Sequence, residues 1–233
     1  MGKTYNLTTT NPPLTVQLFV FLDNSHREIA LTTIFIAGSI SITRLHPKVQ
    51  KRIQNIVSSN FEVVVGDACG ADTAIQECLL AYQTKSVTVY CSGESPRNNL
   101  GCWPVHAVQP SAKVGSRAYF TAKDIAMAHC CDFGLMIWDC VSTGTLSNII
   151  ELLKQKKKSV VFIDKKEEFL TISTIENLNT LISLMPSSAK QRAQEKIDLS
   201  AKIAELSFEQ LPLSWTENLT GENSSSSWTS LIT

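Results

Sequence analysis

The sequence predicts an α/β protein: a Rossmann-like open parallel sheet with helices on both faces, followed by a C-terminal helical extension. Short, nearly continuous apolar runs, such as residues 32–37, are typical of strands buried on both faces of a parallel sheet. These runs alternate about four times with segments whose apolar residues have helical spacing, which is the pattern of doubly wound folds. From Lys165 onward the pattern becomes helical only, which predicts the extension.

The boundaries of each element follow from local signals. The first clear helix opens with Pro47, because proline is favoured in the first turn of a helix. The expected strands are residues 32–37, 61–65, 86–91, 105–108, 133–138 and 159–163, with a further strand at 15–22. The expected helices of the sheet domain are residues 47–58, a helix that follows Asp72 and runs through Tyr82, and residues 116–129 and 146–154.

The chain divides into four parts on this reading. Two helices are expected over 167–184 and 188–206, interrupted by Met185-Pro186. This helical hairpin either packs on the main domain or mediates dimerisation, and we expect a homo-oligomer. The parts are an N-terminal extension (1–30), a Rossmann-like domain (31–165), the helical hairpin (166–210) and a mobile tail (211–233).

Composition narrows the classes of function. The 233 residues include 21 basic and 21 acidic side chains, so the formal net charge is zero and disfavours nucleic acid as a partner. The seven cysteines are odd in number and contain no CxxC pair, so we expect reduced thiols and no metal site. No signal peptide or bilayer-spanning apolar run is present, so a cytoplasmic protein with no membrane partner is expected.

Small and acidic residues follow several of the expected strands. Gly38-Ser39, Gly66-Asp67, Gly93-Glu94 and Asp139 each come directly after a strand. Because ligands of open parallel sheets bind beyond the carboxyl ends of the strands, one crevice should gather these residues. Asp67 could serve ribose hydroxyls or a base. Asp72, further along the same loop, is either functional or simply the N-cap of the helix that follows.

A loop of small and hydroxyl residues precedes the helix expected at 146–154. Its members are Ser142, Thr143, Gly144 and Thr145. Unpaired N–H groups and the positive end of the helix dipole make such a helix start a seat for a phosphate, which glycine allows to approach closely. Arginine and lysine side chains are the expected partners of that phosphate, and the candidates are Arg97, Arg117 and Lys123. We interpret Asp124 as one half of an exposed helix pair with Lys123.

The motifs together resemble those of a known superfamily. They are IAGSISI, VVVGDACGAD, VTVY with a later RNN, and KDIAMAHCCDFGLMIWDCVSTGTLSNI. This set resembles the SMF/DprA and LOG superfamily of Rossmann-like domains, called SLOG, over about residues 32–164. The resemblance implies a nucleotide-related ligand whose phosphate rests on Gly144-Thr145, with Gly38-Ser39 at the first strand.

One position departs from the LOG branch, which cleaves the N-glycosidic bond of cytokinin nucleotides. The resemblance places the catalytic glutamate of that branch at Asn148. An asparagine cannot exchange a proton or support a developing positive charge as a carboxylate does. Glu151, one helical turn further on, is a candidate replacement, as are Asp67 and Asp139.

Two functions of different classes follow from this reading. The first is a binding module that captures a nucleotide, such as a nucleoside phosphate or an NAD-related molecule, for sensing or sequestration, with no cofactor of its own. The alternative is an N-glycosidase or deoxyribosyltransferase-like hydrolase of nucleoside phosphates, with Glu151 or Asp67 as the catalytic carboxylate. A third reading, a DNA-binding relative of the DprA branch, is disfavoured by the absence of net positive charge.

Overall fold

The computed structural model describes residues 31–209 of the chain. The N-terminal extension with its expected strand at 15–22, and the expected mobile tail over 211–233, lie outside the described residues. Within the described residues, no helix is long and apolar enough to cross a membrane.

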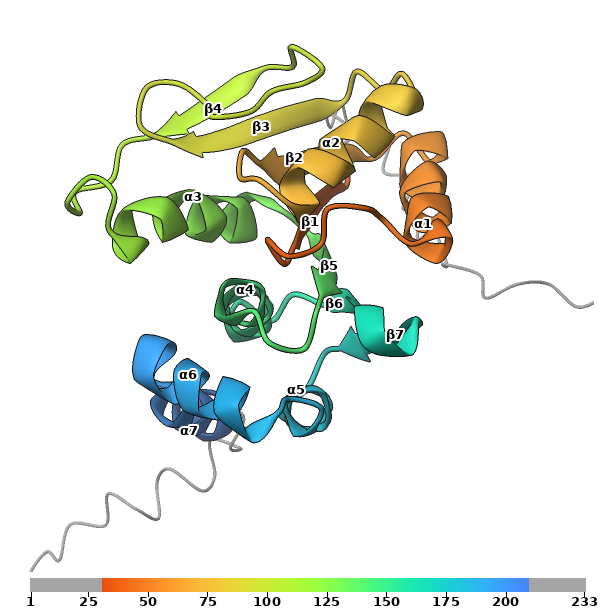
Figure 1. Ribbon diagram of the computed structural model, residues 1–233. Helices are drawn as coiled ribbons and strands as arrows, with labels where there is room; N and C mark the ends of the chain where they lie inside the picture. Colours follow the sequence, from red (N-terminus) through yellow and green to blue (C-terminus); the bar gives the residue numbers. More distant parts are fainter. Residues whose placement is uncertain (1–30, 210–233) are drawn as a thin grey trace, which may run out of the picture. The chain divides into compact units, whose positions relative to one another are not determined.

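A seven-stranded sheet in the order β4-β3-β2-β1-β5-β6-β7 lies at the centre of the described chain (Figure 1). Strands β1 to β6 pair in parallel, and β7 pairs antiparallel with β6. The strands are β1 (Thr33–Gly38), β2 (Glu62–Gly66), β3 (Val87–Ser92), β4 (Val105–Val108), β5 (Phe133–Trp138), β6 (Ser159–Ile163) and β7 (Glu168–Ile172). The predicted α/β fold with a Rossmann-like open sheet is confirmed.

Helices cover both faces of the sheet, as predicted. Helices α1 and α2 contribute to one buried apolar cluster, whereas α3, α4 and the C-terminal helices contribute to another. The helices are α1 (Pro47–Ser58), α2 (Ala71–Ala81), α3 (Arg117–Cys130), α4 (Thr143–Lys154), α5 (Ile175–Ser183), α6 (Ser187–Ile197) and α7 (Leu199–Glu209), with a short 3₁₀ turn η1 (Asp164–Lys166).

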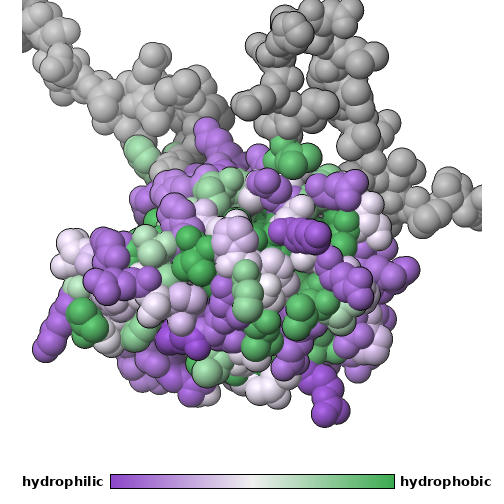
Figure 2. All heavy atoms as spheres, turned by 90° about the horizontal axis from the view of Figure 1, so that it is seen from above, coloured by the Kyte–Doolittle hydropathy of each residue, from purple (hydrophilic) through white to green (hydrophobic). Residues whose placement is uncertain are grey.

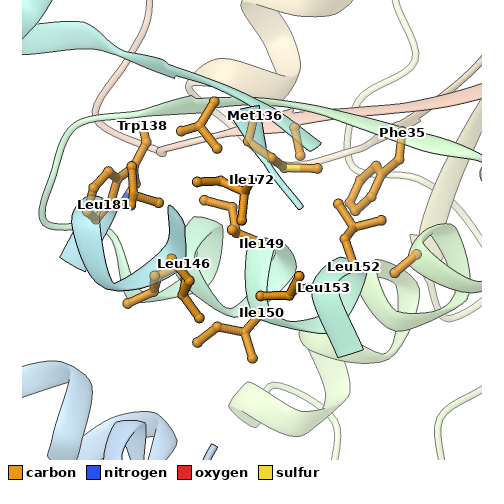
Figure 3. Packing of buried hydrophobic residues seen from close by; sticks show 14 of the residues in the cluster. Phe35, Met136, Trp138, Leu146, Ile149, Ile150, Leu152, Leu153, Ile172 and Leu181 are labelled. Carbon is orange, nitrogen blue, oxygen red and sulfur yellow. The ribbon is translucent and has the colours of Figure 1, made fainter. Parts of the chain in front are cut away.

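The two cores are built by alternation along the strands. Successive side chains of a strand point to opposite faces, so Phe35 belongs to one cluster and Ile36 to the other. Both are fully buried, which explains why β1 reads as a continuous apolar run. Figure 3 shows Ile149 and Leu152 of α4 on the side of the helix that faces Phe35 and Met136 of the sheet.

The region after β6 differs from the prediction of a helix over 167–184. Residues Glu168–Ile172 instead form β7, which pairs with β6 in the register Val161 opposite Leu170. Glu167 adopts a left-handed conformation, with φ of 53°, and turns the chain back antiparallel. The strand is stabilised by this pairing with β6, which the local apolar spacing does not reveal.

The helix predicted over 188–206 is two helices. Asp198 has φ of 48°, a left-handed conformation that ends α6, and α7 begins at the next residue. Aspartate tolerates this conformation better than most residues, because its short side chain can hydrogen-bond locally. Both helices contact α4, and Ala189, Ala193 and Leu206 are buried in the same apolar cluster as α4. The C-terminal helices therefore extend the core on this face of the sheet.

Candidate functional site

The parallel strands bring the predicted strand-end residues to one edge of the sheet. Gly38 ends β1, Gly66 ends β2 and Asp139 follows β5, and β1 is paired with both of the other strands. Gly38 is required by close packing, because a Cβ there would lie 2.7 Å from both the Cβ of Ala71 and the carbonyl oxygen of Ile137. The edge is therefore closely packed at β1.

Hydroxyl groups link the end of β1 to the start of α4. Ser39 is fully buried, and its Oγ accepts a hydrogen bond from the N–H of Asp139 at 3.1 Å. The same oxygen lies 3.3 Å from Oγ1 of Thr145, which lies 3.2 Å from Oγ of Ser142. Ser142 is the N-cap of α4, and its Oγ also accepts from the N–H of Thr145. This hydroxyl cluster, formed by Ser39, Ser142 and Thr145, fixes the helix start against the sheet.

Asp139 holds the loop before α4. Its Oδ1 accepts hydrogen bonds from the N–H groups of Val141 and Ser142, and its Oδ2 accepts from Oγ of Ser41 at 2.6 Å. Burial alone would raise the pKa of Asp139, but these hydrogen bonds outweigh it and hold the pKa below its usual value. The carboxylate is thus engaged in shaping the loop.

Helix α4 begins at Thr143, three residues earlier than the sequence pattern indicates, so the hydroxyl loop forms its first turn. Gly144 lies in that turn, where backbone N–H groups have no partner within the helix. Nη1 of Arg117 donates to Oγ1 of Thr143 at 3.2 Å. The structure therefore places an exposed arginine beside the positive end of a helix, as the sequence predicts.

Asp67 and Arg97 form a two-pronged ion pair. Nη2 of Arg97 lies 2.7 Å from Oδ1 of Asp67, while Nε and the backbone N–H of Arg97 both donate to Oδ2 at 3.0 Å. Asp67 is buried, whereas the Arg97 side chain is 46% exposed. Burial would raise the pKa of Asp67, but the hydrogen bonds from Arg97 and the charge of Lys123 lower it below its usual value. Asp67 therefore stays ionised and orients Arg97.

Lys123 lies at the centre of a buried group of charges. Its side chain is only 5% exposed, and its Nζ lies 2.8 Å from Asp124, 3.7 Å from Asp72 and 3.9 Å from Asp67. Burial acts to lower the pKa of Lys123, but the three carboxylates raise it above its usual value. We call these residues and Arg97 the acid–lysine cluster. Among the described residues no group of His, Cys, Asp and Glu side chains could hold a metal ion, and the ammonium of Lys123 occupies the centre of the three carboxylates.

Two members of this cluster, Asp72 and Asp124, are not evident as such from the sequence. The sequence predicts Asp124 as part of an exposed helix pair and leaves Asp72 open between a helix cap and a functional group. Asp72 accepts a hydrogen bond from the N–H of Ala68 at 3.1 Å, and burial raises its pKa to about 6, although Lys123 acts in the opposite direction. The signal that could have found the cluster is helical spacing: Lys123 precedes the buried Met127 by four residues and so lies on the core-facing side of α3.

An open depression of about 320 Å³ is bordered by members of the acid–lysine cluster and by Gly144 at the start of α4. Its notable feature is Phe120, which is 37% exposed and has the guanidinium of Arg97 4.9 Å from its ring centroid. We call this hollow the strand-end depression. Its lining residues are Ile40, Ala68, Arg97, Arg117, Phe120, Thr121, Lys123, Asp124 and Gly144.

Two predicted residues lie apart from this depression. Glu151 is on α4, roughly 9 Å along the helix axis beyond Thr145, and its Oε1 accepts a hydrogen bond from Gln155. Asn148 is buried, and its side chain makes no hydrogen bond within the described part of the chain. A second cavity of about 430 Å³, bordered by Arg44 and Tyr82 near α1 and α2, contains none of the predicted site residues.

The sequence matches no protein-family model and no curated protein. Among solved structures, the chain is similar to DNA processing protein A from Helicobacter pylori, which was described for its unique single-stranded DNA binding mode. The sequence identity is 16% and the TM-score is 0.43. The similarity covers 56% of this chain and 64% of the other, so the chain spans less than two thirds of the length of that protein.

This comparison contradicts two predictions, which we withdraw. One is the small nucleotide ligand, together with the alternative of nucleoside phosphate hydrolysis, since the similar protein binds single-stranded DNA. The other is that nucleic acid is disfavoured as a partner. That prediction relied on a net charge of zero, which sums the whole chain and does not report how charge is distributed over its faces. At 16% identity and a TM-score of 0.43 this similarity does not test the LOG part of the SLOG resemblance.

Proposed function

We propose that the strand-end depression binds single-stranded nucleic acid, holding its phosphates with arginines and a helix start and stacking a base on Phe120. The observation that carries the proposal is the exposed Phe120 ring, which Arg97 covers on one side, in the same depression as Arg117 and Gly144. The arginines and the start of α4 would contact phosphates of the strand, and the ring of Phe120 would contact a base.

Two exposed arginines line the depression although the chain is neutral, and the carboxylate of Asp124, which also lines it, is paired with Lys123 at 2.8 Å. Asp67 and Asp72 are buried beneath the depression and are engaged by Arg97, Lys123 and the N–H of Ala68. Arg97 and Arg117 are exposed at its surface. Arginine presents a fork of N–H groups that matches phosphate, and the start of α4 adds backbone donors and a favourable dipole.

An exposed aromatic ring beside arginines supports a single strand in particular. A base can stack on Phe120 only when it is free of a duplex, and such stacking is tolerant of sequence because every base has a flat face. The guanidinium of Arg97 is held in place by Asp67, so it need not be ordered when a strand binds.

The shape of the depression supports a polymer over an isolated nucleotide. Small-molecule sites are concave and bury most of the ligand surface. The depression is instead open to solvent over exposed side chains, including Ile40 and Phe120. Figure 2 shows polar and apolar residues interspersed over the face seen from above, rather than one continuous apolar patch.

Loss of the Phe120 ring is expected to weaken binding of a single strand. The variant Phe120→Ala should bind a fluorescent oligothymidylate of about 12 nucleotides roughly tenfold more weakly, because one stacked base is lost. Fluorescence anisotropy at fixed salt measures the affinity. The matched control is Phe133→Ala, since Phe133 is 46% exposed at the start of β5, the opposite end of a strand. Equal losses in the two variants, or no binding by the intact protein, would overturn the proposal.

Loss of Arg117 should change the salt dependence of binding. Each phosphate contact to a single strand contributes about 0.7 to the slope of log affinity against log salt. We therefore expect Arg117→Ala to lower that slope by about this amount. Arg192→Ala, which removes an exposed arginine on α6, serves as the control and should leave the slope unchanged. An unchanged slope in Arg117→Ala would exclude a phosphate contact by this residue.

We also propose that the chain is a member of the SLOG superfamily and acts in the cytoplasm. In this proposal residues 31–165 are the Rossmann-like domain and residues 166–210 are its helical extension. A relation to the LOG branch is supported only by the motif resemblance around Gly144-Thr145. The resemblance involves Ser39 and the start of α4, and these two parts of the chain are joined by the hydroxyl cluster.

A further inference from the structure

The acid–lysine cluster contains more acid than base. Three carboxylates, of Asp67, Asp72 and Asp124, surround Lys123, and Arg97 is the second cation. With every group ionised, three negative charges face two positive charges. Because the cluster is largely buried, this excess of negative charge is poorly screened by solvent.

Asp72 is the carboxylate that the cluster compensates least. Asp67 has Arg97 on both of its oxygens, and Asp124 is closest to Lys123 at 2.8 Å. Asp72 has only the N–H of Ala68 at 3.1 Å and the more distant Lys123 at 3.7 Å. It is also almost completely buried, at 6% exposure. Ionisation of Asp72 is therefore the least favourable in the cluster.

The groups that face Asp72 come from three elements. Lys123 and Asp124 belong to α3, Asp67 and the N–H of Ala68 belong to the loop between β2 and α2, and Arg97 belongs to the loop between β3 and β4. Gly66 completes the packing, because a Cβ at that position would overlap both Asp72 and Lys123. The Asp72 carboxylate is therefore almost completely enclosed by protein, so little water is in contact with it to screen a change in nearby charge.

A phosphate in the strand-end depression would add negative charge on the exposed side of Lys123 and Arg97, both of which line it. We infer that binding of single-stranded nucleic acid is coupled to uptake of a proton by the Asp72 carboxylate, an inference that rests on the function proposed above. The proton comes from solvent and removes the excess negative charge that the incoming phosphate would otherwise meet. Binding and protonation therefore favour each other.

The sign of the coupling follows from linkage. Burial raises the pKa of Asp72 to about 6 in the free protein, with Lys123 and the N–H of Ala68 opposing the rise and Asp124 and Asp67 adding to it. A bound phosphate raises this pKa further. Affinity is therefore highest at a pH below the pKa of the free protein and decreases as the pH rises through the pKa of the complex. For a further rise of about one pKa unit, the affinity changes about tenfold across this range.

The experiment compares the full chain with Asp72→Asn, which resembles a permanently protonated Asp72 and keeps an oxygen to accept from Ala68. Anisotropy with the fluorescent oligothymidylate is measured from about pH 5 to pH 8 at fixed salt. At about pH 8 we expect Asp72→Asn to bind the oligothymidylate about tenfold more tightly than the intact protein does. The affinity of the variant should also lose most of its dependence on pH. Calorimetry in buffers of different ionisation heat should show proton uptake on binding by the intact protein and little uptake by the variant.

A matched control and the possible outcomes separate this inference from the proposed function. Glu168→Gln removes a carboxylate of the same charge, 58% exposed on β7, and should keep the pH dependence of the intact protein. Weaker binding by Asp72→Asn with an unchanged pH profile, or equal proton uptake by both proteins, would overturn the inference while leaving binding established. No binding by the intact protein at any pH would overturn the proposed function itself.

Discussion

Replacing Gly70 with alanine is expected to lower the free energy of unfolding by about 3 kcal/mol or more. Gly70 precedes α2 and has φ of 77°, a conformation that other residues adopt at a cost. A Cβ at this position would also overlap backbone atoms of Ile40, which cannot move aside as the end of a flexible side chain can. Urea unfolding followed by tryptophan fluorescence measures the loss.

Gly115→Ala is the control that separates backbone strain from overlap. Gly115 has φ of 81°, close to that of Gly70, but no atom lies within 4 Å of a Cβ built there. Replacing Gly115 with alanine should therefore lower the free energy of unfolding by only about 1–2 kcal/mol, the cost of placing a non-glycine residue in a left-handed conformation. If the two variants lose the same stability, the close approach of the Ile40 loop to α2 has no energetic importance. Because Ile40 lines the strand-end depression, a larger loss in Gly70→Ala should also be accompanied by weaker binding.

The sheet could be predicted closely because its strands carry their signal locally. Each of the six strands predicted within the described residues agrees with the structure to within one residue at either end. Strands such as β5 (Phe133–Trp138) are buried on both faces and so consist almost entirely of apolar residues. In contrast, β7 is partly exposed and depends on its pairing with β6, so its apolar residues also fit a helical spacing.

The shared edge of the strand-end residues could be predicted, but their interactions could not. The strand-end rule correctly gathered Ser39, Asp67 and Asp139 at one edge, since parallel strands must end together. The rule could not show that the carboxylates of Asp139 and Asp67 accept hydrogen bonds from groups within the protein. These hydrogen bonds depend on loop conformations that have no sequence signature. Burial of Lys123 was detectable from the helical face it shares with Met127. Its distances to Asp67 and Asp72 were not, because these residues are distant in sequence.

Replacing Lys123 with methionine is expected to cost about 3–5 kcal/mol of unfolding free energy at neutral pH. Methionine fills a similar volume but leaves the carboxylates of Asp67, Asp72 and Asp124 with one buried cation fewer. Removing one partner of a buried charge group is costly because the remaining charges stay desolvated. Lys85→Met is the control, since Lys85 is exposed after α2, and it should change stability by less than about 0.5 kcal/mol.

The effect of pH distinguishes the loss of charge compensation from a packing defect in Lys123→Met. Without Lys123, the pKa of Asp72 should rise above the value of about 6 that burial gives it in the intact protein. An acid whose pKa is higher in the folded state binds more protons when folded, so the unfolding free energy increases as the pH falls through the pKa of the folded state. The deficit of the variant should therefore shrink between about pH 8 and pH 5, and adding Asp72→Asn to Lys123→Met should recover part of the loss at neutral pH. A deficit that is independent of pH and unchanged in the double variant would mean that Lys123 contributes through its packing alone.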